Sequence, residues 1–309
     1  MSELLRQSGR RNAQAEACSR PPSRATKALQ TSLYQDELPV IDKEGDGQAM
    51  NRLAYVLTVG RWHMPIGADA DAADAEVDSI LGQRRQRARR RFFQSVIEDD
   101  DRGVLEGIEA GAPLNQVNTD GETPLLVAAK RGYERIVRIL LDAGANLDTR
   151  KAPLFATALY WAVARGHTAI ALLLIERGAN VAITTAERDS PLHAATRYNH
   201  TDIAIALVQA GARLNSVNQL GDTPLLNAIA RGNRAVVRAL LRAGANPNLA
   251  HEDDGRTPLL AAVEGGQRKI VKLLLNAGAD PNRADEEGRT ALDIARQEGR
   301  GEIVQLLEA

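Results

Sequence analysis

Cysteine and aromatic residues are scarce in this chain of 309 residues, which has one cysteine, two tryptophans, five tyrosines and three phenylalanines. The single cysteine, Cys18, excludes an internal disulfide framework and any zinc or iron–sulfur site that requires several cysteines. This cysteine usage is compatible with a reducing compartment. The few aromatic residues therefore stand out, above all the adjacent pair Tyr160 and Trp161.

A strong excess of charge of either sign is also absent, since 39 lysine and arginine residues face 40 aspartate and glutamate residues. The formal net charge of −1 argues against a protein whose whole surface binds nucleic acid, although it leaves room for local basic patches.

Long apolar runs are missing as well. The longest, Ala169 to Ile175, is far shorter than the roughly 18 residues that a membrane-spanning helix needs. Residues 1–30 are polar and arginine-rich, without the apolar segment of a signal peptide. We therefore expect a cytoplasmic protein that does not insert into membranes. Translation from Met50, where "MNRLAYVLTVG" begins, would instead make export conceivable.

What the chain does contain is an internal repeat. Similar blocks follow one another at spacings of 33 or 34 residues, which indicates a repeat architecture. The blocks read "TPLLVAAKRG", "TALYWAVARG", "SPLHAATRYN", "TPLLNAIARG", "TPLLAAVEGG" and "TALDIARQEG". They begin at Thr123, Thr157, Ser190, Thr223, Thr257 and Thr290.

Each block predicts a pair of helices. Threonine or serine is a preferred N-cap, and a proline after it suits the first helical turn. The short helix ends near a glycine such as Gly132, which favours a left-handed helix end. A second stretch, such as "IVRILLDAGAN", has apolar residues at helical spacing. One such unit cannot bury its apolar faces alone, so the units are expected to stack.

The block "SPLHAA" at residues 190–195 resembles the ankyrin repeat, whose signature T-P-L-H-x-A recurs with a period of 33 residues. The resemblance covers residues 92–309. It implies an all-α solenoid of about five full repeats between divergent N-terminal and C-terminal caps. It also implies hairpin loops and short first helices that line a concave face.

Comparison of the blocks separates core positions from surface positions. Leucine occupies the position of Leu125 in every block, and alanine occupies that of Ala128, so both columns are predicted to be core. The Ala129 column ends in Arg296, as a terminal cap without a covering neighbour requires. At the other end, residues 92–117 match the second half of a unit and are interpreted as an N-terminal cap.

The first third of the chain is different. Residues 1–70 show no sustained period and are expected to be a disordered or loosely structured tail. Residues 71–91 form a charged linker that can be helical, with six arginines between Arg84 and Arg91. This run is either a solvated helix face or a site for nucleic acid, nuclear import or acidic membranes. It contains no aromatic residue that could stack on a base.

Catalytic motifs are missing from the sequence. It has no phosphate-binding loop, no nucleophile elbow, no H-E-x-x-H and no dinucleotide fingerprint. His167, His193 and His200 occupy repeat positions, where a structural role is the simpler interpretation. We therefore expect no catalysis, no cofactor and no metal site.

Partner contacts are predicted at the ends of the first helices. At about 100° per residue, Trp161 should point away from the side marked by Leu159 and Ala162, with Arg165 one turn further on. Tyr160 is intermediate. Phe155 is exposed on the preceding hairpin, "RKAPLFA". The two columns before the glycine contribute a basic stripe made of Lys130, Arg131, Arg165, Arg197, Tyr198 and Arg231.

Two explanations of the stripe are open. Lysine and arginine favour helix C-termini in any protein. Tyrosine, tryptophan and arginine are also the residues that dominate binding hot spots. We favour a non-catalytic scaffold that binds an acidic or mixed segment of a partner protein along the concave face. The alternatives are nucleic-acid or phosphate binding through the arginine run and the stripe, and a secreted or regulatory effector that engages a target protein through its repeats.

Overall fold

The computed structural model describes residues 70–309. Within that range the chain forms helices joined by turns and loops and contains no strand, although one isolated bridge pairs Lys151 with Ala156. The predicted all-α fold is thus confirmed. The tail expected over residues 1–70 and the alternative start at Met50 lie outside the described residues, apart from Ala70.

The helices come in pairs. An N-terminal pair, α4 (Ala70–Glu98) and α5 (Asp101–Glu109), precedes the repeats. The first helices of the repeats are α6 (Pro124–Arg131), α8 (Ala158–Ala164), α10 (Pro191–Arg197), α12 (Pro224–Ala230), α14 (Pro258–Glu264) and α16 (Ala291–Gln297). The second helices are α7 (Glu134–Asp142), α9 (Thr168–Glu176), α11 (Thr201–Gln209), α13 (Arg234–Arg242), α15 (Arg268–Asn276) and α17 (Gly301–Leu307).

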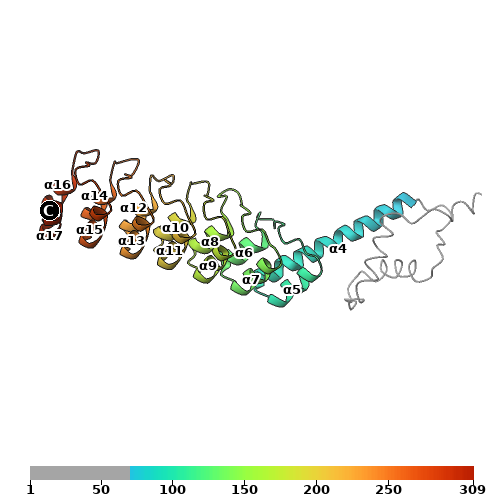
Figure 1. The fold of residues 1–309 in the computed structure, drawn as a ribbon. Coiled ribbons are helices and arrows are strands. Elements are labelled where there is room, and N and C mark those ends of the chain that lie inside the picture. Colours follow the sequence, from blue (N-terminus) through green and yellow to red (C-terminus); the bar gives the residue numbers. More distant parts are fainter. Residues whose placement is uncertain (1–69) are drawn as a thin grey trace, which may run out of the picture. The chain divides into compact units, whose positions relative to one another are not determined.

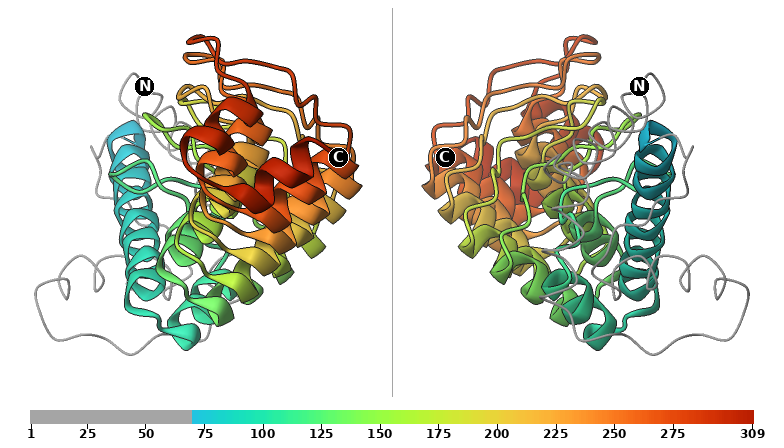
Figure 2. Two further views of the ribbon diagram at one scale, coloured as in Figure 1. Left: turned by 90° about the vertical axis from the view of Figure 1, so that its left-hand side faces the viewer. Right: turned by 90° about the vertical axis from the view of Figure 1, so that its right-hand side faces the viewer.

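Residues 88–309 form one compact unit with two layers of helices. Each first helix packs against the first helix of the next repeat, and the second helices pack on one another in the same way. The loops between repeats all project from one edge of this stack (Figure 1). A view along the stack shows the two layers side by side, each with its helices in register (Figure 2). We call the first helices the inner layer and the second helices the outer layer.

The predicted N-caps are all present. The hydroxyl of each cap accepts a hydrogen bond from the backbone N–H three residues later, for example from Leu126 to Thr123 at 3.2 Å. In the third repeat His193 completes a capping box with Ser190. The short helices end in a left-handed residue, either glycine or, in the third repeat, Asn199 with φ 61°. These caps fix where each repeat begins and ends.

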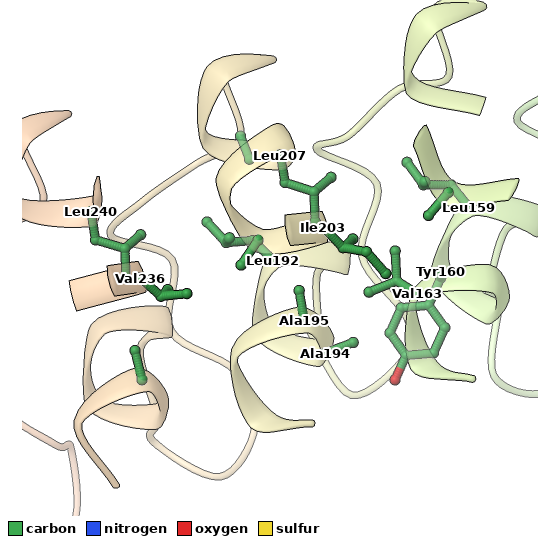
Figure 3. Close-up of a cluster of buried hydrophobic side chains, with 14 of the residues drawn as sticks. Leu159, Tyr160, Val163, Leu192, Ala194, Ala195, Ile203, Leu207, Val236 and Leu240 are labelled. Carbon is green, nitrogen blue, oxygen red and sulfur yellow. The ribbon is translucent and has the colours of Figure 1, made fainter. Parts of the chain in front are cut away.

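The two core columns are confirmed. The alanines at the Ala128 position are fully buried in all six repeats, and the leucines at the Leu125 position are buried in five, while Leu292 in the last repeat is half-buried. Leu159 and Leu192 lie in a cluster with side chains of the outer layer such as Ile203 and Leu207 (Figure 3). Small alanines let adjacent inner helices approach, and the larger side chains fill the space between layers.

Both ends of the stack carry polar or divergent residues. Arg296 is exposed on α16 and donates a hydrogen bond to Glu308 at 2.7 Å, whereas Val163 and Val263 at the same column are fully buried. At the other end, Phe92 and Val96 from the last turns of α4 are buried in the core of the repeats.

Candidate partner-binding surface

The ends of the inner helices, together with the hairpin loops next to them, form the surface on which sequence analysis places a partner. We call it the inner face. It contains the nine predicted contact residues, and the structure gives them different surroundings. These residues are Lys130, Arg131, Phe155, Tyr160, Trp161, Arg165, Arg197, Tyr198 and Arg231.

Trp161 is half-buried and packs against the core, so the prediction that it points away from the stack is wrong. The same column is buried in the other five repeats, where it holds Val127, Ala194, Asn227, Ala261 and Ile294. The reason is that α8 is flanked by two other inner helices, α6 and α10, so more than one of its faces is covered. Part of the Trp161 ring remains accessible because tryptophan is larger than the residues of its column.

Two cations lie over the Trp161 ring. The Lys130 ammonium is 5.0 Å from the ring centroid, and the Arg165 guanidinium is 5.9 Å from it. Both distances are within the range of cation–π attraction. Arg165 is exposed, and its side chain has no hydrogen-bonding or ionic partner within residues 70–309. Its charge and its N–H donors are therefore available to a ligand.

Tyr160 is buried, with 7% of its surface exposed, so its assignment as a contact residue is corrected. Its ring lies in the core cluster (Figure 3), and its hydroxyl donates a hydrogen bond to Asp189 of the next repeat at 3.2 Å. Burial raises the pKa of Tyr160, and the Asp189 carboxylate raises it further. Tyr160 thus occupies the signature histidine position, where His193 bonds to Ser216 of the following loop at 3.0 Å.

Arg197 is held by the same carboxylate. Its guanidinium donates to Asp189 at 2.8 Å, and the amide of Asn218 donates to the same oxygen at 2.9 Å. Asp189 is only 1% exposed, and such a buried charge needs both pairing and hydrogen bonds. The network joins three successive repeats. The charge of Arg197 is therefore largely committed inside the protein.

The basic stripe consists of two columns, and the first is the position of Lys130, Arg197 and Glu264. This position carries an ion pair in every second repeat. Lys130 bonds to Glu122 at 3.0 Å, and Lys151 of the next hairpin bonds to the same oxygen at 3.2 Å. In the fifth repeat the signs are reversed, and Arg256 bonds to Glu264 at 2.6 Å. Burial alone would raise the pKa of Glu122, but the hydrogen bonds from Lys130 and Lys151 lower it. The partner lies eight residues earlier each time, just before the N-cap.

Two arginines in the second column of the stripe contact backbone carbonyls of the preceding unit. Arg131 donates to the carbonyl of Ile97 at 2.9 Å, and Arg231 donates to that of Arg197 at 2.7 Å. A carbonyl does not neutralise the arginine charge, and both side chains are exposed. Arg131 and Arg231 consequently serve repeat packing and still present positive charge on the inner face.

Tyr198 and Phe155 are the exposed aromatic residues of this surface. Tyr198 is 50% exposed and lies 6.2 Å from the ring of His200, and Phe155 is 44% exposed with the Arg150 guanidinium 5.8 Å from its ring. Phe155 also has a left-handed backbone, with φ 54°. Such a conformation is strained for a bulky residue and occurs preferentially at functional sites.

A cavity of about 640 Å³ opens between the first two repeats. It lies at the C-terminal ends of α6 and α8, where both columns of the stripe meet. His167 stands at its edge, with its Nε2 3.4 Å from the carbonyl oxygen of Lys130. The lining residues are Glu122, Val127, Lys130, Arg131, Tyr133, Arg165 and His167.

Comparison with protein families decides the identity of the repeats. The family described as "Ankyrin repeats (3 copies)" matches residues 95–185, 178–251 and 240–308. These matches cover more than half of the chain. The protein belongs to the ankyrin repeat family. A search of curated proteins returned no match.

Solved ankyrin repeat structures are similar to this ankyrin protein. A crystal structure of an ankyrin repeat domain from Acinetobacter baumannii AYE is 36% identical, with a TM-score of 0.57. A crystal structure of a second ankyrin repeat protein is 33% identical, with a TM-score of 0.55. Each comparison covers 60% of this chain and 96% of the other chain. Ankyrin repeats are generally protein–protein interaction modules, and this general function applies to the family as a whole.

Some residues of this ankyrin surface were not predicted from the sequence. Asp189 and Asn218 tie repeats together, and Leu220 is 61% exposed at the tip of a hairpin. The sequence did contain a pattern that could have drawn attention to Asp189, because an acidic residue directly precedes the N-cap in three of the six blocks. No such signal existed for Leu220, since its exposure depends on the path of the loop.

In residues 70–309 no group of three or more histidine, cysteine, aspartate or glutamate residues could hold a metal ion. No helix of the same range is long and apolar enough to cross a membrane.

Proposed function

We propose that this ankyrin repeat protein is a non-catalytic scaffold that binds a protein partner along the inner face. The observation that carries the proposal is Arg165, an exposed cation over the ring of Trp161 without an ionic partner in residues 70–309. Tryptophan, tyrosine and arginine dominate the energetics of protein interfaces. The exposed rings of Tyr198 and Phe155 extend the surface beyond Arg165.

The charge of this surface favours an acidic or mixed partner segment. Lys130 and Arg197 are already ion-paired with Glu122 and Asp189, so they contribute little free charge. Arg131, Arg165 and Arg231 remain exposed without a carboxylate partner in the described residues. Complementary charge across an interface speeds association and fixes orientation. We therefore assign the contacts chiefly to Trp161, Arg165, Tyr198, Phe155, Arg131 and Arg231.

Charge reversal at Arg165 tests the proposal. Tagged full-length protein would be expressed in cells of the organism that encodes it, and captured proteins would be identified by mass spectrometry. Arg165→Glu and Tyr198→Ala should abolish or strongly reduce capture of the same protein. Arg238→Glu and Leu172→Ala, which change exposed residues of the outer layer, should not. Equal capture by all four variants would contradict the assignment.

A second candidate is nucleic-acid binding through the arginine run at 84–91. The observation that favours it is the exposure of Arg85, Arg87, Arg90 and Arg91 on α4, although Arg87 makes contacts within the protein. A filter-binding assay with single-stranded and double-stranded DNA and RNA would test it. Binding that weakens steeply with salt supports this candidate, because phosphate contacts release counterions. Absent or salt-insensitive binding contradicts it.

A further inference from the structure

The cavity between the first two repeats has an uneven charge balance. Three of its lining side chains, Lys130, Arg131 and Arg165, are cationic, and one, Glu122, is a carboxylate. Glu122 already accepts hydrogen bonds from Lys130 and from Lys151, which approaches from the next hairpin. The single carboxylate is therefore satisfied, and the lining keeps an excess of positive charge.

The donors in this cavity are only partly used. Arg131 uses one N–H on the carbonyl of Ile97, which leaves its charge unpaired. The Arg165 side chain makes no hydrogen bond within residues 70–309. The ring of Trp161 attracts both Lys130 and Arg165 without accepting their N–H donors in conventional hydrogen bonds. Lys130 is already paired with Glu122, so of the two cations over Trp161 it is Arg165 that remains able to bind an anion.

Two arginines of the lining, Arg131 and Arg165, have no carboxylate partner in the described residues, which favours a doubly charged group. A phosphoryl group on a side chain carries about −1.5 to −2 charges near pH 7 and offers three acceptor oxygens. A carboxylate carries one charge and two oxygens. Arginine pairs bind phosphoryl groups through forked N–H donors, and clusters of them recognise phosphorylated proteins.

We propose that this cavity binds the phosphoryl group of a phosphorylated side chain on the protein partner, with Arg165 and Arg131 as its ligands. This inference rests on the proposed function only in that the group belongs to a protein bound at the inner face. Val127 and Tyr133 provide the apolar wall against which the body of the modified side chain would lie.

Peptides that differ in one group test the proposal directly. The probes are a fluorescein-labelled glycine–serine peptide with one phosphoserine, the same peptide with serine, and the same peptide with glutamate. Fluorescence anisotropy with the full-length protein at fixed salt should show binding of the phosphopeptide and competition by inorganic phosphate. The glutamate peptide should bind at least about tenfold more weakly, and the serine peptide should not bind detectably.

Variants locate the binding. Arg165→Gln and Arg131→Gln should each weaken phosphopeptide binding about tenfold, the size expected for loss of a charge-assisted hydrogen bond. Arg238→Gln removes an exposed arginine of the outer layer and should change nothing. Thermal unfolding of each variant separates loss of binding from loss of folding.

Three results would overturn the proposal. These are equal binding of the phosphoserine and glutamate peptides, no binding of the phosphopeptide, or equal weakening by Arg165→Gln and Arg238→Gln. The proposed scaffold function is tested by protein capture, independently of phosphopeptide binding. If Arg165→Glu abolishes protein capture while the phosphopeptide does not bind, the inner face is still the binding surface and only the phosphoryl group is excluded as its ligand.

Discussion

Tyr160 and His193 occupy the same position in successive repeats and use different chemistry for one task. Each side chain is buried in an inner helix, and each makes a hydrogen bond to the next unit, Tyr160 to Asp189 and His193 to the carbonyl of Ser216. Three sister repeats fill the position with leucine, and the last holds Asp293, which bonds only to Thr290 of its own repeat. The position is thus a packing site to which two repeats add a polar link.

Removal of the Tyr160 hydroxyl tests this link. Tyr160→Phe keeps the ring and loses the hydrogen bond to Asp189, so the free energy of unfolding should fall by about 1 kcal/mol. Tyr198→Phe is the matched control, because the Tyr198 ring is exposed and its hydroxyl makes no hydrogen bond in the described residues. Urea unfolding of both variants gives the comparison. Equal stability of the two variants would show that the buried link contributes nothing.

The burial of His193 should make the stability of the protein depend on pH. Burial lowers its pKa below the usual histidine value, although the nearby Asp189 carboxylate opposes this, and its Nδ1 accepts a hydrogen bond from the backbone N–H of Ser190. The unfolded chain therefore binds the proton more readily than the folded one. Stability should fall as the pH decreases through about 6.5 and below.

His193→Leu, which installs the residue of three sister repeats, is the test of that dependence. The difference in unfolding free energy between pH 7.5 and pH 5.5 should be smaller in the variant than in the unchanged protein. His200, whose pKa burial also lowers, remains in both proteins and cancels in the comparison. An unchanged pH dependence would mean that His193 is not protonated on unfolding in this range.

Core positions were predictable from the sequence where all repeats agree. The Leu125 and Ala128 columns could be assigned to the core because each holds one residue type throughout. Trp161 could not be placed correctly, because a helical wheel marks the side facing the outer layer and omits the neighbouring inner helices. The exposure of Tyr198 was anticipated, whereas the burial of Tyr160 depends on Asp189, a residue 29 positions away.

At the scale of elements, the inner helices carry an ion pair in every second repeat. The residue before the N-cap pairs with the residue eight positions later, as in Asp189–Arg197 and, with reversed sign, Arg256–Glu264. The pair spans the whole short helix and therefore ties its loop to its C-terminal end. The residues at which the helices begin were predictable from their N-caps. The ion pairs were not, because two residues eight positions apart meet only when the loop before the helix bends toward the C-terminal end of that helix.

Burial should make these two pairs unequal. The Asp189 side chain is 1% exposed and that of Glu264 is 28% exposed. Double-mutant cycles with alanine should give a coupling energy of about 2 kcal/mol for Asp189–Arg197 and below about 1 kcal/mol for Arg256–Glu264. Equal coupling energies would contradict the importance assigned to the buried network.

At the scale of the whole molecule, a repeat stack is a chain of nearest-neighbour interfaces that must end in a polar surface. Arg296 is exposed on the last inner helix, where the second and fifth repeats bury Val163 and Val263. The sequence predicted this end of the stack because a single column changes from apolar to charged. The Arg165 site required the structure, since it joins α6 and α8 of different repeats.

Arg296→Val should therefore promote self-association. The substitution restores the apolar residue of interior repeats on a surface that no other repeat of residues 70–309 covers, and exposed apolar patches drive association. Sedimentation velocity should show concentration-dependent oligomers for this variant. Arg268→Val, on the outer layer, is the control and should remain like the unchanged protein. Identical sedimentation of both variants would show that Arg296 is not needed to end the stack.

The central claim is that a protein partner lies on the inner face, and site-specific photo-crosslinking in cells tests it most directly. A photoreactive phenylalanine would replace Tyr198 on the inner face in one protein and Leu172 on the outer layer in another, since both side chains are exposed. We predict that the probe at position 198 forms an adduct with one partner protein, that Arg165→Glu removes this adduct, and that the probe at position 172 forms none. An adduct at position 172 in the absence of one at position 198 would contradict the claim.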